Sequence, residues 1–470
     1  MDSDDRRLCV ECIGEDYVCR LIIAGGALKV CDYCGRLAET ETLEALADQL
    51  EGVFKAHMRR TPTDPVGYEV ALAAEDGFER RGDPTAQAIA NLLGIDEAPA
   101  NDLQALLSER HWDIERAKMG EESEFDAQAH YEESRINDLE FQLGWRAFEA
   151  GLQTRGRFFN RAAEAVLAEL FDGVEGHATH DGRRVVCDIG PGSDIESLHR
   201  ARVFQASAPL EAALTAPESL IGSPASAFAS AGRMNARGIS VFYGATDPKL
   251  ALAEVRPPVG SRVIVGRFDI LRPLRVLDVE ALENLYVDGS LFDPAFGRRL
   301  ELAKFLERLA NRIRMPVMPN DEATDYLATQ AMAEYLADRL DPGLDGVVYG
   351  SAQGVAGAFN VVLFHHAAMV EPGPPHVGAV DVWHPQAEDA VFPAHYTVWS
   401  EPEPPVAPEA AQPATFMPLL AFFEEPVIDR EPTLRLDRDS LTVRLVKAVK
   451  VCTEDFEVER RVSPGRDAPF

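Results

Sequence analysis

Hydrophobic positions recur every three or four residues through most of the chain between about Leu43 and Gly173. The stretch LEALADQLEGVFKAHM, which begins at Leu43, is one such segment, and its spacing is typical of an amphipathic helix. Two more sets of apolar residues share a helical face farther along: Phe141, Trp145, Phe148 and Leu152, followed by Phe159, Ala163, Val166 and Leu170. The pattern predicts a helical section whose apolar faces form the core.

From Leu198 onward, short β-branched runs alternate with amphipathic segments. SRVIVGRFDI and LRVLDV are strand-like, and DGVVYGS and FNVVLFHH are typical of short buried strands. GRRLELAKFLERLANRI and DYLATQAMAEYLADRL have the spacing of helices instead. A last strand-like run, SLTVRLVKAVKVC, follows a segment rich in Pro, Glu and Ala. This half of the chain therefore predicts a mixed α and β structure.

Four of the seven cysteines form two CxxC pairs, CVEC at Cys9 and Cys12 and CDYC at Cys31 and Cys34. The spacing is that of a zinc ribbon, in which four thiolates close a tetrahedral site around one ion. Gly25-Gly26 between the pairs predicts a hairpin tip. We expect structural zinc here, either as a folding staple or in a module that recognises protein or RNA. Four cysteines leave no open position for catalysis.

These patterns together predict an α+β fold with several parts, as expected for a chain of 470 residues. The predicted parts are a zinc ribbon over residues 1–42, a helical region over 43–185, a mixed α/β domain over 190–370, a Pro-rich linker or insertion over 371–415, and a C-terminal β segment over 416–470.

The formal net charge of −32 changes the range of partners to expect. Phosphate contacts need a surplus of Lys and Arg, so broad binding to nucleic acid or to a membrane surface is disfavoured, except for RNA through the ribbon. No apolar run reaches the length of a membrane span, and the N-terminus lacks the pattern of a signal peptide. With paired cysteines typical of a reducing compartment, these features predict a cytoplasmic protein. The oligomeric state stays open, a dimer included.

Several familiar catalytic motifs are missing from the sequence. There is no GxxxxGK[ST] phosphate loop, no HExxH and no GxSxG elbow. The helical region could suggest a ribonuclease of the HEPN type, but the Arg-x(4–6)-His signature occurs nowhere. Polar residues at the edges of the predicted strands remain as candidates: Arg200, Arg202, Arg233, Tyr243, Glu254, Ser351 and Asn360.

Each candidate has an ordinary explanation alone, such as a solvated charge or a turn residue. Together they suit NAD, although the chemistry does not make NAD unique among nucleotides. Arginines can bind a pyrophosphate through forked hydrogen bonds, and a tyrosine ring can stack on nicotinamide. Breaking the nicotinamide–ribose bond builds positive charge on the ribose, which a carboxylate can stabilise.

The stretch from about Leu198 to His366 resembles the RES domain family, named for its Arg, Glu and Ser. HRARVF, GRMNARGISVFYGATDPKLALAEVRPPVG, RVLDV, DYLATQAMAEYL and DGVVYGSAQGVAGAFNVVLF occur in the order of that family. The pieces CVECIGED, CDYCG and LGWRAFEAGLQTRGRFF also resemble the zinc-ribbon and helical region, labelled HEPN/RES, that precedes some of these domains.

The resemblance implies a toxin module that degrades NAD by hydrolysis or phosphorolysis, with a fold similar to that of ADP-ribosylating toxins. It implies catalytic roles for Arg200, Arg233, Glu254 and Ser351, and substrate binding by Tyr243 and Asn360. Arg202 is an alternative to Arg200 because residues two apart share one face of a strand. Two rival functions are ADP-ribose transfer to a protein and a non-catalytic binding protein centred on the ribbon. A separate Xre-type antitoxin is the partner that the family implies.

Overall fold

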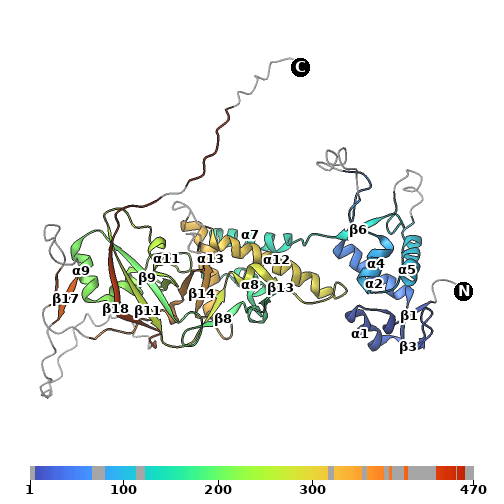
Figure 1. Ribbon diagram of the computed structural model, residues 1–470, viewed down its shortest axis with the longest axis horizontal. Helices are drawn as coiled ribbons and strands as arrows, with labels where there is room; N and C mark the ends of the chain where they lie inside the picture. Colours follow the sequence, from blue (N-terminus) through green and yellow to red (C-terminus); the bar gives the residue numbers. More distant parts are fainter. Residues whose placement is uncertain are drawn as a thin grey trace, which may run out of the picture. The chain divides into compact units, whose positions relative to one another are not determined.

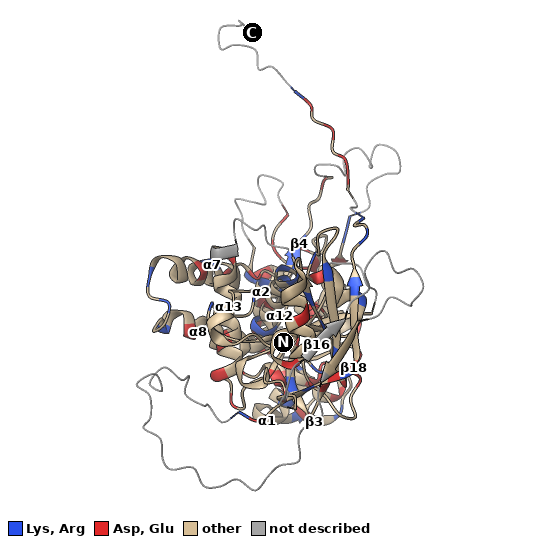
Figure 2. Ribbon diagram, turned by 90° about the vertical axis from the view of Figure 1, so that its left-hand side faces the viewer, with Lys and Arg blue, Asp and Glu red and all other residues tan. Residues whose placement is uncertain are grey.

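The computed structural model describes residues 6–65, 80–112, 122–315, 322–351, 357–374, 380–383, 396–400, 430–450 and 453–460. The chain divides into two compact units. The first comprises Met1–Val185 and Glu280–Ile313, and the second comprises Val186–Val279 and Arg314–Phe470. Helices and strands occur in both units, and the predicted α+β character is confirmed (Figure 1). Lysine and arginine are interspersed with aspartate and glutamate on the drawn ribbon, although acidic residues dominate the composition (Figure 2).

The cysteine-rich segment of the first unit combines a three-stranded antiparallel sheet with one helix. Its elements are β1 (Arg7–Cys9), η2 (Val10–Cys12), α1 (Asp16–Gly25), β2 (Ala27–Val30) and β3 (Leu37–Thr42). The predicted hairpin tip at Gly25-Gly26 is wrong, because Gly25 ends α1 and Gly26 leads directly into β2. A side chain at Gly26 would lie 2.5 Å from the carbonyl oxygen of Ile22, so this tight exit requires glycine.

The helical part of the first unit buries the apolar faces that the sequence pattern predicts. The bounds are α2 (Leu43–His57), α4 (Thr85–Leu93), α5 (Glu97–Arg110), α7 (Leu139–Thr154), α8 (Arg161–Phe171) and α12 (Pro294–Arg314). A small sheet adds β4 (Met58–Arg60), β5 (Asp83–Pro84) and β6 (His130–Glu133), and a two-stranded one adds β7 (Ala178–Thr179) and β13 (Leu285–Tyr286). Phe141 and Trp145 of α7 pack against Phe305 of α12. Phe159 was predicted to lie in the core and is instead 97% exposed, because α8 begins only at Arg161.

The second unit is built on one eight-stranded sheet with the order β18-β11-β9-β10-β15-β14-β12-β8. Its strands are β8 (Val186–Ile189), β9 (Ser197–Phe204), β10 (Phe242–Ala245), β11 (Arg262–Ile270), β12 (Leu274–Asp278), β14 (Gly346–Gly350), β15 (Phe359–Leu363) and β18 (Leu434–Leu445). The pair β12–β14 is parallel and the other neighbours are antiparallel. The sheet's helices are α9 (Ser207–Thr215), α10 (Pro217–Ile221), α11 (Pro248–Glu254) and α13 (Glu322–Asp338).

Apolar side chains alternate between the two faces of this sheet, as the period of a strand requires. One face buries Leu198, Phe242 and Phe268 in a large cluster. The other buries Ala201, Ala245 and Val263 against Leu250 and Ala251 of α11. Helix α11 thereby lies over the central strands (Figure 1), and its last residue is Glu254.

The strands β9 and β10 adjoin at one residue pair, Ala245 opposite His199. They diverge beyond it, which opens the sheet next to Arg200 and Tyr243. Most of the Pro-rich segment predicted at 371–415 lies outside the described residues. Two short strands within its described part, β16 (Val380–Trp383) and β17 (Thr397–Ser400), pair with each other. No helix in the described part of the chain is long and apolar enough to cross a membrane.

Candidate functional site

A cavity of about 460 Å³ opens where α11 meets the four central strands of the second unit. Its floor includes a row of four residues that stand directly opposite one another: His199 on β9, Ala245 on β10, Asn360 on β15 and Tyr349 on β14. Four arginines also line it, and we call it the arginine cavity: Arg200, Arg233, Arg256 and Arg314. Its volume lies in the range usual for small-molecule sites.

Glu254 is the acidic side chain of this lining, and two neighbours fix its orientation. Asp247 caps the start of α11 by accepting from the backbone N–H groups of Lys249 and Leu250, at 2.6 and 3.2 Å. At the other end of the helix, Glu254 Oε1 accepts hydrogen bonds from Ser351 Oγ and from Asn360 Nδ2, both at 2.8 Å.

Asn360 is 6% exposed, whereas Glu254 is exposed to solvent. A buried amide therefore holds a carboxylate that a ligand can reach. The structure thus brings together Glu254, Ser351 and Asn360, three residues that the sequence singled out as separate candidates. The lining thus combines one carboxylate, held by two donors, with four arginines.

Arg200 lies where β9 and β10 diverge. Its Nη1 donates to the backbone oxygen of Tyr243 at 2.8 Å, and its guanidinium lies 5.1 Å from the centre of the Phe242 ring. Burial, together with the neighbouring charge of Arg202, lowers the pKa of Arg200 to about 10, so the side chain remains charged at neutral pH. Arg202 itself is exposed, donates to the backbone oxygen of Leu220 and is outside the cavity lining.

Arg233 projects from a tight loop, Gly232–Asn235, that Tyr243 holds in place. The Tyr243 hydroxyl donates to Asn235 Oδ1 at 2.9 Å and accepts from the Met234 backbone N–H at 3.1 Å. Burial raises the pKa of this hydroxyl to about 12. A Cβ on Gly232 would lie 2.6 Å from the same hydroxyl, so glycine is needed for the loop to pack against the ring. The Tyr243 hydroxyl is therefore engaged within the protein, while the residue lines the arginine cavity.

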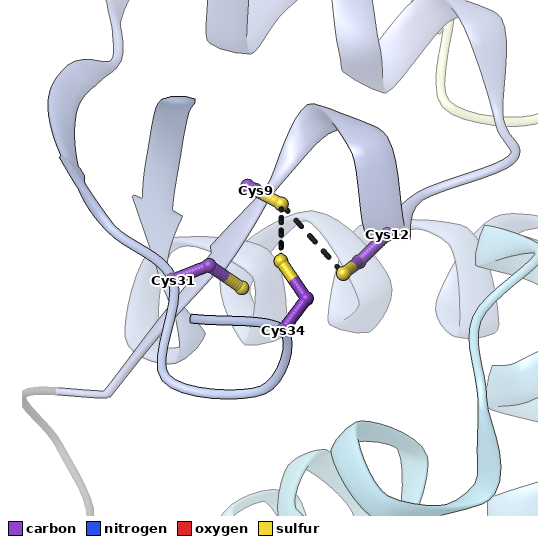
Figure 3. Close-up of side chains that lie close together, drawn as sticks. All are labelled: Cys9, Cys12, Cys31 and Cys34. Carbon is purple, nitrogen blue, oxygen red and sulfur yellow. Dashed lines mark hydrogen bonds between the residues drawn. The ribbon is translucent and has the colours of Figure 1, made fainter. Parts of the chain in front are cut away.

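The four paired cysteines of the first unit also form a cluster (Figure 3). The sulfur atoms of Cys9, Cys12, Cys31 and Cys34 all lie within 4.8 Å of one another. Cys9 Sγ is 3.6 Å from Cys12 Sγ and 3.5 Å from Cys34 Sγ. A tetrahedral ion with metal–sulfur bonds of about 2.3 Å separates its ligands by roughly 3.8 Å, so the four thiols fit such an ion. Burial raises the pKa of Cys9 and Cys12, which a bound cation would oppose.

Comparison with known proteins finds one family match, in the part of the chain that contains the arginine cavity. Residues 198–384 match the family model of the RES domain. The chain contains a RES domain. No curated protein and no solved structure matches the chain. The match begins at Leu198 in β9 and so takes in every candidate residue of the arginine cavity that the sequence predicted, whereas the four cysteines precede it.

The RES domain cavity also contains residues that the sequence analysis missed: His199, Arg256, Arg314, Tyr326 and Tyr349. Tyr349 could have been found, because it lies two residues before Ser351 and so on the same face of the chain. Arg256 has a left-handed φ of 42°, a conformation that is uncommon outside glycine and that often marks a functional site. Arg314 is the last residue of α12 and belongs to the second unit, and Tyr326 lies on α13; no local pattern in the sequence assigns either residue to the cavity.

The charge balance of the arginine cavity predicts its ligand class. Four arginines face one glutamate in a chain whose net charge is −32, so the cavity is a local exception to the acidic surface. We expect Arg233→Gln to weaken binding of ADP by about tenfold, the loss of one charge-assisted contact. Calorimetric titration measures this. Arg202→Gln removes an equal charge outside the cavity and is expected to leave ADP affinity unchanged; an equal loss in both variants would contradict the assignment.

His199 predicts how the stability of the RES domain depends on pH. Burial, the first of several causes, lowers the pKa of His199 in the folded protein. In the unfolded chain this histidine takes up a proton at about pH 6.5, whereas in the folded chain it stays neutral to lower pH. The free energy of unfolding is therefore unaffected by His199 above about pH 6.5 and decreases as pH falls below that value. We expect urea denaturation between pH 7.5 and 5.5 to show a shallower loss of unfolding free energy in His199→Asn. A loss as steep as in the wild type would contradict the prediction.

Proposed function

We propose that this protein consumes NAD by breaking the bond between nicotinamide and ribose. The observation that carries the proposal is Glu254, an accessible carboxylate fixed by Ser351 and Asn360 within a cavity lined by arginines. The RES domain match supports an NAD-related toxin activity in general terms. The cleavage reaction, its acceptor and the residue roles are our proposal.

Arg233 would bind the pyrophosphate of NAD, because a guanidinium matches phosphate oxygens with paired donors. Arg200 would add positive charge from the gap between β9 and β10, since it lines the same cavity. The Tyr243 ring would lie against nicotinamide, because its hydroxyl is already bonded to the Gly232–Asn235 loop. These contacts would set the ribose beside Glu254.

In the reaction, the C–N bond between ribose C1 and nicotinamide breaks, and its electron pair leaves with nicotinamide as a neutral molecule. The positive charge then moves onto the ribose, where the carboxylate of Glu254 stabilises it. Water or phosphate attacks C1; with water, the released proton passes to solvent and the products are nicotinamide, ADP-ribose and a proton. Ser351 and Asn360 position the carboxylate and need not touch the reacting carbon.

We also propose that the cysteine cluster holds zinc. Four thiolates close a tetrahedral site and leave no position for water or substrate, so the ion would stabilise the fold of the N-terminal segment. It would supply no chemistry to NAD cleavage.

The experiment that tests the proposed function measures nicotinamide release from NAD by the purified full chain, with and without phosphate. Release in buffer alone with ADP-ribose as the other product indicates hydrolysis, whereas release that requires phosphate indicates phosphorolysis. Biotinylated NAD separates the transferase alternative, because transfer would label a protein band. If the chain still binds ADP but releases no nicotinamide with or without phosphate and labels no protein, the proposal is contradicted.

A further inference from the structure

A second cavity, of about 290 Å³, lies on the other side of the Gly232–Asn235 loop. We call it the α13 cavity, because Ala333, Glu334, Ala337 and Asp338 of that helix form one of its walls. It shares no lining residue with the arginine cavity. The activity proposed above makes no use of it.

The walls of the α13 cavity are largely apolar. Met234, Val241, Ala333 and Phe364 contribute to them, and each is less than 5% exposed. A volume of 290 Å³ corresponds to about ten water-sized groups. The space therefore suits a short apolar chain or one ring.

Two carboxylates give this cavity its charge. Glu334 and Asp338 are four residues apart on α13, so they lie on one face of the helix and repel each other. Both side chains also reach solvent. Partial burial, followed by the charge of Asp338, raises the pKa of Glu334. The histidines of the lining are already engaged: His365 Nδ1 lies 2.9 Å from the Ser240 oxygen, and His366 Nε2 lies 3.3 Å from Asp345 Oδ1. A bound cation would relieve the repulsion between the carboxylates.

The same short loop separates the two cavities. Gly232 and Arg233 line the arginine cavity, whereas Met234 and Asn235 line the α13 cavity. Asn235 is 5% exposed, and its Nδ2 donates to the backbone oxygens of Ser230 and Ile239, both at 2.9 Å. The two cavities therefore share this loop, and buried hydrogen bonds of Asn235 hold it in place.

Helix α13 also connects the two cavities. Tyr326, near its start, lines the arginine cavity. One turn later, Thr329 Oγ1 donates to the Arg233 oxygen at 2.5 Å, and Gln330 Nε2 donates to the oxygens of Gly232 and Asn235 at 2.8 and 3.0 Å. Glu334 follows Gln330 by one further turn. A ligand beside Glu334 would thus contact the same helix that donates hydrogen bonds to the Gly232–Asn235 loop.

We propose that the α13 cavity binds a small organic cation, a primary amine with a short apolar body, and that its occupation strengthens anion binding in the arginine cavity. The effect is electrostatic. The cation offsets the negative field of Glu334 and Asp338, which otherwise weakens the attraction of Arg233 for anions.

The test uses the full-length protein and hexylamine as the probe, measured by isothermal titration calorimetry. Hexylamine is expected to bind at one site, and hexan-1-ol and hexanoate, which match its length without the positive charge, are expected to bind at least about tenfold more weakly. Glu334→Gln and Asp338→Asn are each expected to weaken hexylamine binding about two- to fivefold. Glu211→Gln on α9 removes one negative charge at a position outside the cavity lining, and hexylamine affinity should stay unchanged.

A cavity-filling variant provides an independent test. Ala337→Leu is expected to abolish hexylamine binding, whereas Ala331→Leu, on the same helix but outside the lining, is expected to retain it. Equal binding of the three probes, or unchanged binding in Ala337→Leu, would overturn the site.

Inorganic pyrophosphate reports on the arginine cavity without any dependence on NAD cleavage. Saturating hexylamine is expected to tighten pyrophosphate binding about fivefold, and pyrophosphate to tighten hexylamine binding by the same factor. A pyrophosphate affinity that is unchanged or unmeasurable with hexylamine bound would overturn the coupling. Because no step uses NAD cleavage, failure here is distinguishable from failure of the proposed enzymatic function.

Discussion

Glu254→Gln is expected to lower the rate of nicotinamide release at saturating NAD by about a hundred- to a thousandfold. Glutamine keeps the size of the side chain and can still accept hydrogen bonds from Ser351 and Asn360, so the cavity should keep its shape. What disappears is the negative charge that stabilises the ribose in the transition state. Because this charge acts mainly as the bond breaks, the maximal rate should fall far more than the affinity for NAD.

Two further variants make this result specific. Glu211→Gln, on α9 and outside the lining, removes the same charge and should keep the wild-type rate. Asn360→Ala leaves Glu254 charged but removes one of its two donors, so we expect an intermediate loss in the maximal rate with little change in KM. A Glu254→Gln variant that releases nicotinamide at the wild-type rate would remove this residue from the mechanism.

Removal of zinc is expected to unfold the cysteine-rich segment of the first unit. Metal analysis of the purified protein should find one zinc per chain. Structural zinc contributes about 10–16 kcal/mol in small zinc-binding peptides, more than a short segment of this kind can supply from its own core. Cys31→Ser or a strong chelator should therefore eliminate the protection of residues 6–42 in hydrogen exchange.

Cys19→Ser is the matched control for the zinc prediction. Cys19 Sγ lies outside the four-cysteine cluster and donates to the backbone oxygens of Val10 and Ile13, at 3.5 and 3.3 Å, which a serine hydroxyl can also do. This variant should keep its zinc and its protection. Full zinc content in Cys31→Ser would show that these four thiols are not the ligand set.

The sequence predicted elements best where the pattern is local. The run SRVIVGRFDI corresponds to β11, and LRVLDV to β12, because β-branched residues that pack on a pleated surface mark a strand without reference to the rest of the chain. Phe159 shows the limit of the method. The helical spacing placed Phe159 on the apolar face of the helix that follows it. Because α8 begins only at Arg161, the Phe159 ring lies before the helix and in solvent.

The candidate site shows a different limit. Glu254 and Asn360 are 106 residues apart, and only the pairing of β10 with β15 brings them to 2.8 Å. Residues two apart on a strand point to the same face, so the sequence left both Arg200 and Arg202 as candidates for the cavity. Arg202 instead donates to the backbone oxygen of Leu220. Its orientation thus depends on a partner outside the strand, which the pattern of the strand does not reveal.

The edges of the eight-stranded sheet bear on how this protein can be divided. The family match covers residues 198–384, but the outermost strands, β8 and β18, lie before and after it. Leu434 and Leu436 of β18 are buried in the same core as Phe268. A fragment cut at the family limits would expose the whole hydrogen-bonding edge of β11, together with apolar surface, and would tend to aggregate. An active fragment should therefore extend from about residue 186 to 450, and an insoluble shorter piece would report a missing strand rather than a missing activity.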